Sequence, residues 1–354
     1  MNYTIFDLSG MRGWKRHYDA LPEPMQDVYF MPEYYEVQER HGKGTAQCFV
    51  IENEKGMLLY PFLLNSIVPL GFDLADEYCD IEGAYGFNGA ISNAQDTDLL
   101  KSFHELFSEY AGYKGIIAEF TRFNPVLRNH SISSHLDIVF ANQNISLNLD
   151  HDNFWFDDYE HATRKNINKA IRNGLTVSFF HGDEVIDEWL DHFYSIYIDT
   201  MVRNKAEQFY FFDRSYFDML IKNMKNNVLL FFTMKEGTPV STELVLYNTN
   251  IAYSYLGGTI SEYFPFRPND ILKHSIILRL KDHGVKRYCL GGGIKPGDSL
   301  FKYKRSFAKN GIIDFFIGKK IYREDIYNKL VGKWEMLNPD KKDVYKNFLL
   351  KYRI

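Results

Sequence analysis

The sequence is poor in cysteine and in patterns that bind metals. Cys48, Cys79 and Cys289 are the three cysteines among 354 residues, and they stand far apart, in no Cys-x-x-Cys or Cys/His spacing. This excludes a disulfide framework and indicates a reducing compartment. The 11 histidines show no His-Glu-x-x-His or similar spacing, so we expect no bound metal.

Long apolar runs are also lacking. The most apolar stretch, residues 56–72, is interrupted by Pro61, Asn65, Ser66 and Pro69, and it falls short of the ~20 apolar residues that span a bilayer. The first residues lack the basic start and apolar core of a secretory signal. We therefore expect a cytoplasmic protein, with peripheral membrane contact left open.

The chain has no excess of positive charge. Its 41 Lys and Arg residues against 46 Asp and Glu residues give a net charge of -5. Coating of DNA by bulk attraction needs cations spread over a surface, so we expect no DNA partner, while local basic patches remain open. Aromatic residues are abundant, with 29 Phe and 25 Tyr, and they favour a bulky core.

The order of predicted elements occurs twice along the chain. Residues 32–64 read as a helix, a strand, a turn containing Gly56 and a second strand, and residues 215–247 read the same way with Gly237 at the turn. Each stretch is followed by a helix, a glycine and a strand. We therefore predict two similar α/β domains, with the break near residue 150.

A strongly one-sided helix is predicted over residues 162–173, ended by Gly174. At about 100° per residue its polar arc and its apolar arc face opposite ways. The polar arc contains Arg164, Lys165, Asn168, Lys169 and Arg172, and the apolar arc contains Ile167, Ala170 and Ile171. The polar arc is either a solvated face or a clamp for phosphate, which the rigid fork of arginine suits better than lysine.

Two later segments point to an anion site. A predicted strand runs into Gly257 and Gly258, a loop follows, and Asn269 is a plausible N-cap for a buried helix. The N–H groups and dipole at such a helix start attract anions. The next strand ends in three glycines at 291–293, where we expect positive φ or a close visitor to the backbone. Three cations follow, namely Lys302, Lys304 and Arg305. Together these segments favour a phosphate-bearing acyl donor.

Seven short motifs in this order resemble one family. They are DIEGAYGFNGA (80–90), AEFTRFNPVLRN (118–129), RKNINKAIRNG (164–174), YSYLGGT (253–259), RPND (267–270), YCLGGG (288–293) and DSLFKYKRSF (298–307). The chain resembles the Fem-type, GNAT-like acyltransferases, which include the peptidoglycan interpeptide-bridge aminoacyltransferases and the BioF2-like acetyltransferase domains. The resemblance extends over nearly the whole chain.

The resemblance implies a fold of class α/β (α+β) with two tandem GNAT-like domains, each a mixed, mostly antiparallel sheet flanked by helices. The expected domains are 1–150, on the acceptor side and completed by the C-terminal helices 321–354, and 151–320, on the donor and phosphate side.

The resemblance also implies N-acyl transfer, in cell wall, peptidoglycan or polysaccharide biosynthesis. An acetyl or aminoacyl group moves from acyl-CoA or aminoacyl-tRNA, used as co-substrate with no permanently bound cofactor. The acceptor is an amine of a cell-envelope precursor or amino sugar, either a small molecule or a lipid- or nucleotide-linked one. The acceptor end of tRNA is a candidate partner, and the oligomeric state stays open.

The family pattern assigns donor-side roles to a set of residues. Lys304 matches the lysine near the donor carbonyl, where it would stabilise the oxyanion formed by direct attack of the amine. Arg164 matches an arginine that contacts substrate phosphate. Tyr255 has two interpretations, as a wall of the donor cleft or as a core residue. The other expected donor-side residues are Lys165, Gly257, Gly258, Asn269 and Arg305.

The acceptor side is assigned in the same way. Asp80 is the first candidate for the general base, with Glu82 and Glu243 next, and a solvated loop carboxylate is the competing interpretation for each. The expected acceptor contacts are Tyr85, Arg122 and Asn124. Their competing interpretations are structural, because Tyr85 also suits core packing and Arg122 also suits pairing with Glu119.

Two departures from the family pattern leave the donor open. The long coiled-coil arm of some bridge-forming enzymes is missing, which weakens the case for tRNA. The usual GNAT pyrophosphate signature is replaced by PFRPND at 265–270, which weakens the case for CoA. The alternative function is a non-catalytic GNAT-like module that binds nucleotide-linked glycans or RNA ends.

Overall fold

The computed structural model describes residues 2–354 and divides the chain into two compact units. The first unit contains Met1–Ala141 and Phe315–Ile354, and the second contains Asn142–Asp314. The division falls earlier than the expected breaks after residues 150 and 320, because two long strands, β7 (Asp137–Asn148) and β13 (Ile312–Ile321), run through the points of division.

The first unit has a sheet in the order β1-β2-β3-β4-β6-β13, with β5 paired to β3. Neighbouring strands are antiparallel except for the parallel pair β4 and β6. Its strands are β1 (Tyr3–Phe6), β2 (Thr45–Asn53), β3 (Gly56–Ser66), β4 (Cys79–Glu82), β5 (Ile91–Ser92) and β6 (Ile116–Arg122), together with β13.

Helices cover the first unit through aromatic contacts. Its helices are α1 (Met11–Asp19), α2 (Pro32–Arg40), α3 (Thr97–Tyr113) and α10 (Glu324–Leu337). Asp96 caps α3 by accepting from the Leu99 N–H. Phe103 and Phe107 of α3 pack on Phe49 and Tyr60 of the sheet. The aromatic content thus goes into the core, as the composition suggested.

The second unit repeats this arrangement in the order β8-β9-β10-β11-β12-β7. Here the parallel pair is β11 and β12, and the other neighbours are antiparallel. Its remaining strands are β8 (Thr176–His181), β9 (Val228–Lys235), β10 (Thr238–Tyr247), β11 (Ile251–Thr259) and β12 (Arg287–Gly292). The repeated strand order confirms the predicted fold class of two similar mixed sheets.

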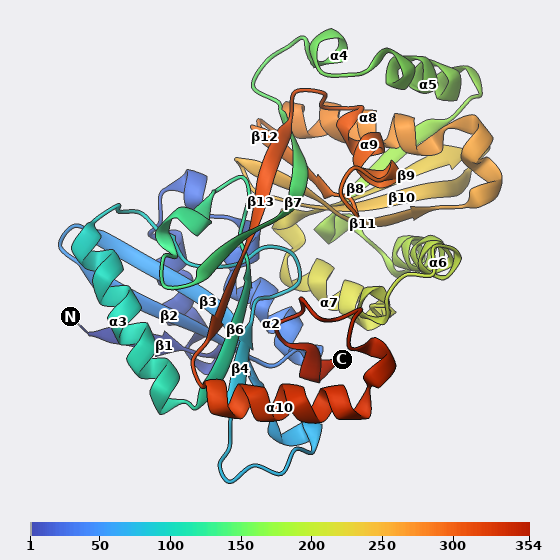
Figure 1. Cartoon of the computed structure of the whole chain (residues 1–354). Coiled ribbons are helices and arrows are strands. Elements are labelled where there is room, and N and C mark those ends of the chain that lie inside the picture. The colour runs from blue at the N-terminus through green and yellow to red at the C-terminus, as the bar shows by residue number, and fades with distance from the viewer. Residues whose placement is uncertain (1) are drawn as a thin grey trace. The chain divides into compact units, whose positions relative to one another are not determined.

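The helices of the second unit are α4 (Phe154–Asp157), α5 (His161–Arg172), α6 (Asp187–Arg203), α7 (Arg214–Asn223), α8 (Pro268–Asp282) and α9 (Ser299–Arg305). The predicted buried helix is α8, which packs on β9 and β10 and against α5 (Figure 1). Its buried Leu272, Ile276, Ile277 and Leu280 belong to the core of this unit.

The C-terminal segment forms one helix, α10, followed by short 3₁₀ turns at Pro339–Lys341 and Lys351–Arg353. Leu330 and Trp334 of α10 pack with Tyr352 in a small core of the first unit. Within residues 2–354, no helix is long and apolar enough to cross a membrane.

Candidate active site

The parallel strands β11 and β12 separate before they end. They pair only from Ile251 with Arg287 to Tyr253 with Cys289. Beyond that point β11 pairs with β10 up to Thr259, and β12 pairs with β7 up to Gly292. We call the place where residues 254–259 and 290–292 diverge the fork. A fork in a sheet exposes backbone groups and side chains from several elements to one place.

Lys304 of α9 lies at the fork. Its Nζ donates to the carbonyl oxygen of Gly292 at 2.7 Å. Asp298 sets the start of α9 because its carboxylate accepts from the N–H groups of Phe301 and Ile294. Partial burial, and next the charge of Lys273, lower the pKa of Lys304 to about 8. A lysine with a pKa near neutrality is typical of functional sites.

The three glycines at 291–293, at the end of β12 and directly after it, shape the fork. Gly291 has φ of 73°, a left-handed conformation that favours glycine, and the pairing register with β7 shifts at this place. A Cβ on Gly291 would lie 3.4 Å from Lys304 Nζ, and one on Gly293 would meet Asp298. The side chains that lie close to this backbone are thus Lys304 and Asp298. Glycine is also favoured at 291 by the positive φ.

A buried ion pair lies under the fork. Lys273 of α8, 5% exposed, donates to Glu243 of β10, 8% exposed. The same ammonium donates to Ser254 Oγ at 3.0 Å and to Tyr288 OH at 3.1 Å, and Tyr288 donates to Glu243. Each of the three ammonium N–H groups therefore has an acceptor. Glu243, one of the candidate bases, is therefore already paired with Lys273 and Tyr288.

Gly257 and Gly258 have a structural role that the sequence analysis missed. A Cβ on Gly257 would lie 2.3 Å from the carbonyl oxygen of Thr242. A Cβ on Gly258 would lie 2.6 Å from the carbonyl oxygen of Ile196 in α6. The close neighbour at these two glycines is therefore protein backbone, and their expected role in donor binding stays a prediction.

Asn269 differs from its expected N-cap role, whereas Tyr255 matches its interpretation as a core residue. Arg267, with φ of 65°, is the N-cap of α8, and Asn269 lies within the first turn. The Asn269 Oδ1 accepts from Ser241 and Thr259, which fastens α8 to β10 and β11. The Tyr255 hydroxyl shares a hydrogen bond with Tyr216, and the ring is 7% exposed. Both side chains are thus engaged in packing the unit.

The basic helix forms as α5, with a buried arc that differs in one residue. Thr163, Ile167 and Ala170 are buried, whereas Ile171 is 54% exposed. Arg164 donates to the carbonyl oxygens of Trp155 at 3.2 Å and Tyr159 at 2.6 Å. Arg164, which was expected to bind phosphate, thus uses its Nη1 to hold the turn that precedes α5.

The other basic residues come closer to expectation. Ser306, directly after α9, accepts at its carbonyl oxygen from the Glu160 N–H and the Thr163 hydroxyl, which joins α5 to α9. Lys165 is exposed on α5. Arg305 is exposed on α9, 3.7 Å from Glu160. The two basic segments, α5 and α9, are thus neighbours in the second unit.

Asp80, the first candidate base, is sealed in the first unit. It is 0% exposed, and Arg353 Nε donates to its two oxygens at 2.9 and 2.7 Å. Tyr352 donates to it at 2.9 Å. Desolvation raises the pKa of Asp80, and Arg353 opposes that shift. A base must reach the acceptor, so this burial removes Asp80 from the candidates.

Glu82, two residues on, has a different environment. Its side chain is exposed at the end of β4. Restricted hydration, and then the charge of Asp80, raise its pKa, whereas Arg122 lowers it. Arg122 is exposed and lies 5.7 Å over the ring of Phe315. Glu119, its other expected partner, is instead bonded to Tyr60 and Tyr322.

The remaining acceptor candidates are held by the backbone of their loops. Asn124 is 0% exposed, and its Oδ1 accepts from the N–H groups of Val126 and Leu127. It is therefore a turn residue, not an acceptor contact. Tyr85 is half-buried, and its carbonyl oxygen accepts from Tyr34 OH. Asn88 connects the two acceptor-side motifs, because its Oδ1 accepts from the Arg122 N–H at 2.7 Å.

The family comparison decides the class of the second unit. The family profile described as an acetyltransferase (GNAT) domain matches residues 161–305, a range that includes α5, the fork and Lys304. We call residues 161–305 the GNAT domain because of this likeness. The match supports an acyltransferase.

Solved structures resemble the chain over more than this GNAT domain. The crystal structure of FemX is 13% identical, has a TM-score of 0.66, and matches 92% of this chain and 99% of that one. A conserved protein of unknown function from Bacteroides thetaiotaomicron is 10% identical, has a TM-score of 0.53, and matches 90% of this chain and 99% of that one. At these identities the likeness shows the fold. No curated protein sequence matches the chain.

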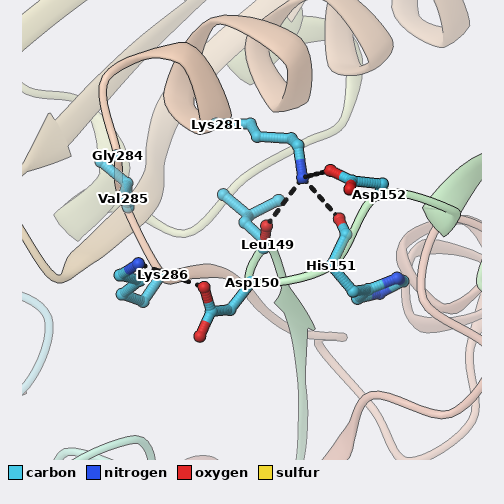
Figure 2. A pocket seen from close by; sticks show the side chains of 8 residues that line it. All are labelled: Leu149, Asp150, His151, Asp152, Lys281, Gly284, Val285 and Lys286. Carbon is cyan, nitrogen blue, oxygen red and sulfur yellow. Dashed lines mark hydrogen bonds and ion pairs between the residues drawn. The ribbon is translucent and has the colours of Figure 1, made fainter.

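A separate pocket of ≈ 310 Å³ lies at the other end of α8 in the second unit (Figure 2). Lys281 meets Asp152 at 2.8 Å, and Lys286 meets Asp150 at 3.1 Å. These pairs neutralise the cations of the pocket, so its charge does not favour a phosphate donor. No group of side chains within residues 2–354 is arranged to hold a metal ion.

Sequence reasoning missed Lys273 and Tyr288 in the GNAT domain. Lys273 is a cation within a helix that is otherwise apolar where it faces the sheet, and that position was a usable signal, because buried lysines need a partner. The identity of the partner, Glu243 on another strand, depends on the strand register.

Proposed function

We propose that the chain is an N-acyltransferase in which the amine of an acceptor attacks an activated acyl group at the fork of the GNAT domain. The observation that carries this proposal is Lys304, whose Nζ is held at the fork by the Gly292 carbonyl oxygen. No Ser/His/Asp or Cys/His arrangement stands out in the sequence, so we favour direct attack over an acyl-enzyme.

The proposed step needs little covalent chemistry from the protein. The acceptor nitrogen forms a bond to the acyl carbon, and the bond from that carbon to sulfur or oxygen breaks as the CoA thiolate or the tRNA hydroxyl leaves. A proton is lost from the attacking nitrogen. Protonated Lys304 stabilises the negative oxygen that develops on the carbonyl, and a partly desolvated site strengthens this interaction.

For the acceptor side we propose Glu82 as the base, with Arg122 as a neighbouring contact for an anionic group of the acceptor. Glu82 is exposed, and its raised pKa brings the carboxylate closer to the range that suits proton removal at neutral pH. Tyr85 stays a proposed acceptor contact. Glu82 thereby replaces the sealed Asp80.

The donor is proposed from the start of α8. Asp270 in its first turn is 6% exposed, accepts from Asn166 at 3.2 Å, and has a pKa raised by desolvation. A carboxylate there competes with a diphosphate for the dipole and the N–H groups of the helix start. This observation favours an aminoacyl ester of tRNA, whereas the family description favours acetyl-CoA.

The acceptor class is proposed from the resemblance to the Fem-type family and the likeness to FemX. It is an amine of a cell-envelope precursor or amino sugar, bearing a lipid or nucleotide group. We place the reaction in the cytoplasm, where acyl-CoA and aminoacyl-tRNA occur. Lys165 and Arg305 are the exposed cations proposed to meet donor phosphates.

The test is acyl transfer by the full chain from two donors, acetyl-CoA and an aminoacylated CCA-ended RNA, to a panel of amino sugars and peptidoglycan precursors. We expect product by mass spectrometry with one donor, and a raised melting temperature in its presence. A donor that stabilises the protein without any transfer favours the non-catalytic binding module. Absence of both effects with both donors contradicts the proposal.

A further inference from the structure

The short segment that joins β11 to α8 points its aromatic side chains in two directions. This segment is the 3₁₀ helix Ser261–Phe266. Tyr263 and Phe266 pack against a small core of the second unit. Phe264, which lies between them in the sequence, is 44% exposed. Single exposed apolar side chains are common on protein surfaces, so the surroundings of Phe264 decide whether it has a use.

A guanidinium lies over the Phe264 ring and is held in place. The Arg203 Cζ of α6 lies 5.2 Å from the centre of this ring. The Arg203 Nη1 donates to Asp199 at 3.0 Å and to the Thr259 carbonyl oxygen at 2.9 Å. Its Nη2 donates to the Thr200 hydroxyl at 3.3 Å. Three acceptors restrict this long side chain, so the ring and the guanidinium form a preformed pair. We call Phe264 and Arg203 the platform.

The platform lies at the open end of the fork. Its Arg203 is bonded to Thr259, the last residue of β11, and α6 packs along β11 (Figure 1). Thr259 is six residues beyond Tyr253, whereas Gly292, which holds Lys304, is three residues beyond the partner of Tyr253 on β12. At about 3.3 Å per residue, the end of β11 lies roughly 10 Å farther along the sheet than Gly292.

The first turn of α8 connects the platform to the helix of Lys304. The Asn269 side chain accepts from the Thr259 hydroxyl, and the Asn269 carbonyl oxygen accepts from Tyr303 OH at 3.0 Å. Tyr303 directly precedes Lys304 on α9. Arg267, directly after the 3₁₀ helix, is an exposed cation, and an exposed guanidinium suits a phosphate. One hydrogen-bonded frame thus carries the platform, a cation and Lys304.

The chemistry of the platform fits a nucleobase. Bases stack on aromatic rings and on guanidinium planes, and this stacking tolerates different bases because each base has a π-face. Both proposed donors carry such a base, since CoA contains adenine and aminoacyl-tRNA ends in CCA. In both donors a ribose or a longer linker separates the base from the acyl group. A platform beyond Lys304 at the open end of the fork suits that separation.

We propose that Phe264 and Arg203 form the stacking site for a nucleobase of the acyl donor. This inference rests on the proposed function, because it takes the donor to be an acyl group carried by CoA or by tRNA. The chemistry shared by the two donors is a base attached to an anionic phosphate, and Arg267 is the neighbouring cation for that phosphate. The platform binds the donor and takes no part in bond formation.

The first experiment measures binding without turnover. The full-length protein is titrated by calorimetry with CoA, with 4′-phosphopantetheine as its base-free counterpart, with a CCA trinucleotide, and with the same ribose-phosphate backbone lacking all bases. Phe264→Leu keeps an apolar side chain and removes the ring. Phe156→Leu is the matched control, because Phe156 is 65% exposed and the Arg164 Cζ lies 5.7 Å from its ring centre.

We expect Phe264→Leu to weaken binding of CoA or of CCA roughly tenfold, the usual effect of losing one stacked base, and to leave binding of the base-free counterpart unchanged. Phe156→Leu should change neither. A loss with CoA alone identifies CoA as the source of the base, and a loss with CCA alone identifies tRNA. The proposal is overturned if neither CoA nor CCA binds, if Phe264→Leu binds both as wild type does, or if the base-free probes lose affinity equally.

A gain of signal covers a failure of Phe264→Leu to fold. Phe264→Trp keeps an aromatic ring and should keep the affinity. A base stacked on the new indole quenches its fluorescence, so the probe that binds should lower the emission of Phe264→Trp more than that of wild type. Equal quenching in the two proteins at saturating probe overturns the proposal.

The platform and the proposed function fail in different ways. If Phe264→Leu weakens binding as expected but no donor supports transfer, the platform stands and the proposed function fails. If a donor supports transfer with the same KM in wild type and Phe264→Leu, the proposed function stands and the platform fails.

Discussion

The parallel strand pair of each unit, β4 with β6 and β11 with β12, has a different structure in the two units. In the first unit, the parallel strands β4 and β6 stay paired to the end of β4. Asp80 of β4 is hydrogen-bonded by Tyr352 and Arg353, which cover it. In the second unit, β11 and β12 diverge after three pairs, and Lys304 reaches the fork. The two units share a strand order, yet Asp80 on β4 is buried, whereas Lys304, which follows β12, lies at the fork.

Fold alone therefore does not assign chemistry to a unit. The Asp80 carboxylate is paired with Arg353 and inaccessible, whereas Lys304, whose pKa is lowered, lies at the fork. The sealed unit is then suited to hold an acceptor at its surface, where Glu82 and Arg122 are exposed.

The largest effect should separate Lys304 from Asp80 in catalysis. We expect Lys304→Met to lower kcat by roughly 10²–10³-fold, the usual effect of removing one oxyanion donor. Asp80→Asn should leave kcat unchanged in the folded fraction, because Asp80 does not reach the acceptor. Steady-state rates with the active donor measure both. An equal loss in both variants would show that the two positions are not functionally different.

The seal of the first unit should be visible in its stability. Arg353→Met leaves the buried Asp80 without its cation, and we expect a loss of roughly 3 kcal/mol in the free energy of unfolding. Lys342, in an exposed pair with Glu335 at 2.8 Å, is the control, and Lys342→Met should cost no more than about 1 kcal/mol. Urea unfolding measures both. Similar small losses would mean that the seal contributes little.

The shape of the fork should depend on α6. Gly258→Ala places a methyl group against the Ile196 carbonyl oxygen and Thr200, and we expect a loss of about 1–3 kcal/mol. Gly332 of α10 has open space around it, so Gly332→Ala should instead stabilise by about 0.5–1 kcal/mol. Thermal unfolding compares them. A neutral Gly258→Ala that weakens donor binding would return this glycine to the donor site.

The smallest effect concerns the basic helix. Arg164→Ala removes donors from the carbonyl oxygens of Trp155 and Tyr159, and we expect a loss of about 1 kcal/mol in stability with an unchanged KM for the donor. Lys169→Ala, exposed on the same helix, should change stability by less than about 0.5 kcal/mol. A raised KM with unchanged stability in Arg164→Ala would restore its role as a phosphate ligand.

Local pattern was enough for much of the fold. The repeated helix and hairpin, the buried α8 and the glycine with positive φ at 291 each depend on residues close in sequence. Asp80 was misjudged because its partner Arg353 lies 273 positions away. Asn269 was misjudged as an N-cap because its partners Ser241 and Thr259 come from other elements, and periodicity does not reveal such contacts.

Some residues of the candidate site were likewise predictable from local sequence, and others were not. Lys304 and the convergence of α5 with α9 followed from motif order, since one segment comes before and the other after the same glycine-lined loop. The Lys273–Glu243 pair needed the register of β10 against β11, which pairs Glu243 with Gly257. Register depends on the whole sheet, so it is not readable from either strand alone.

The strand β13 determines when the sheet of the first unit can be completed during synthesis of the chain. Ile317 of β13 pairs with Arg122 of β6, 195 positions earlier (317 − 122). At ~5–20 residues added per second, β6 waits roughly 10–40 s for its partner. The N-terminal unit therefore stays open at one edge while the ribosome makes the GNAT domain, and this edge is the place where a chaperone would be needed first.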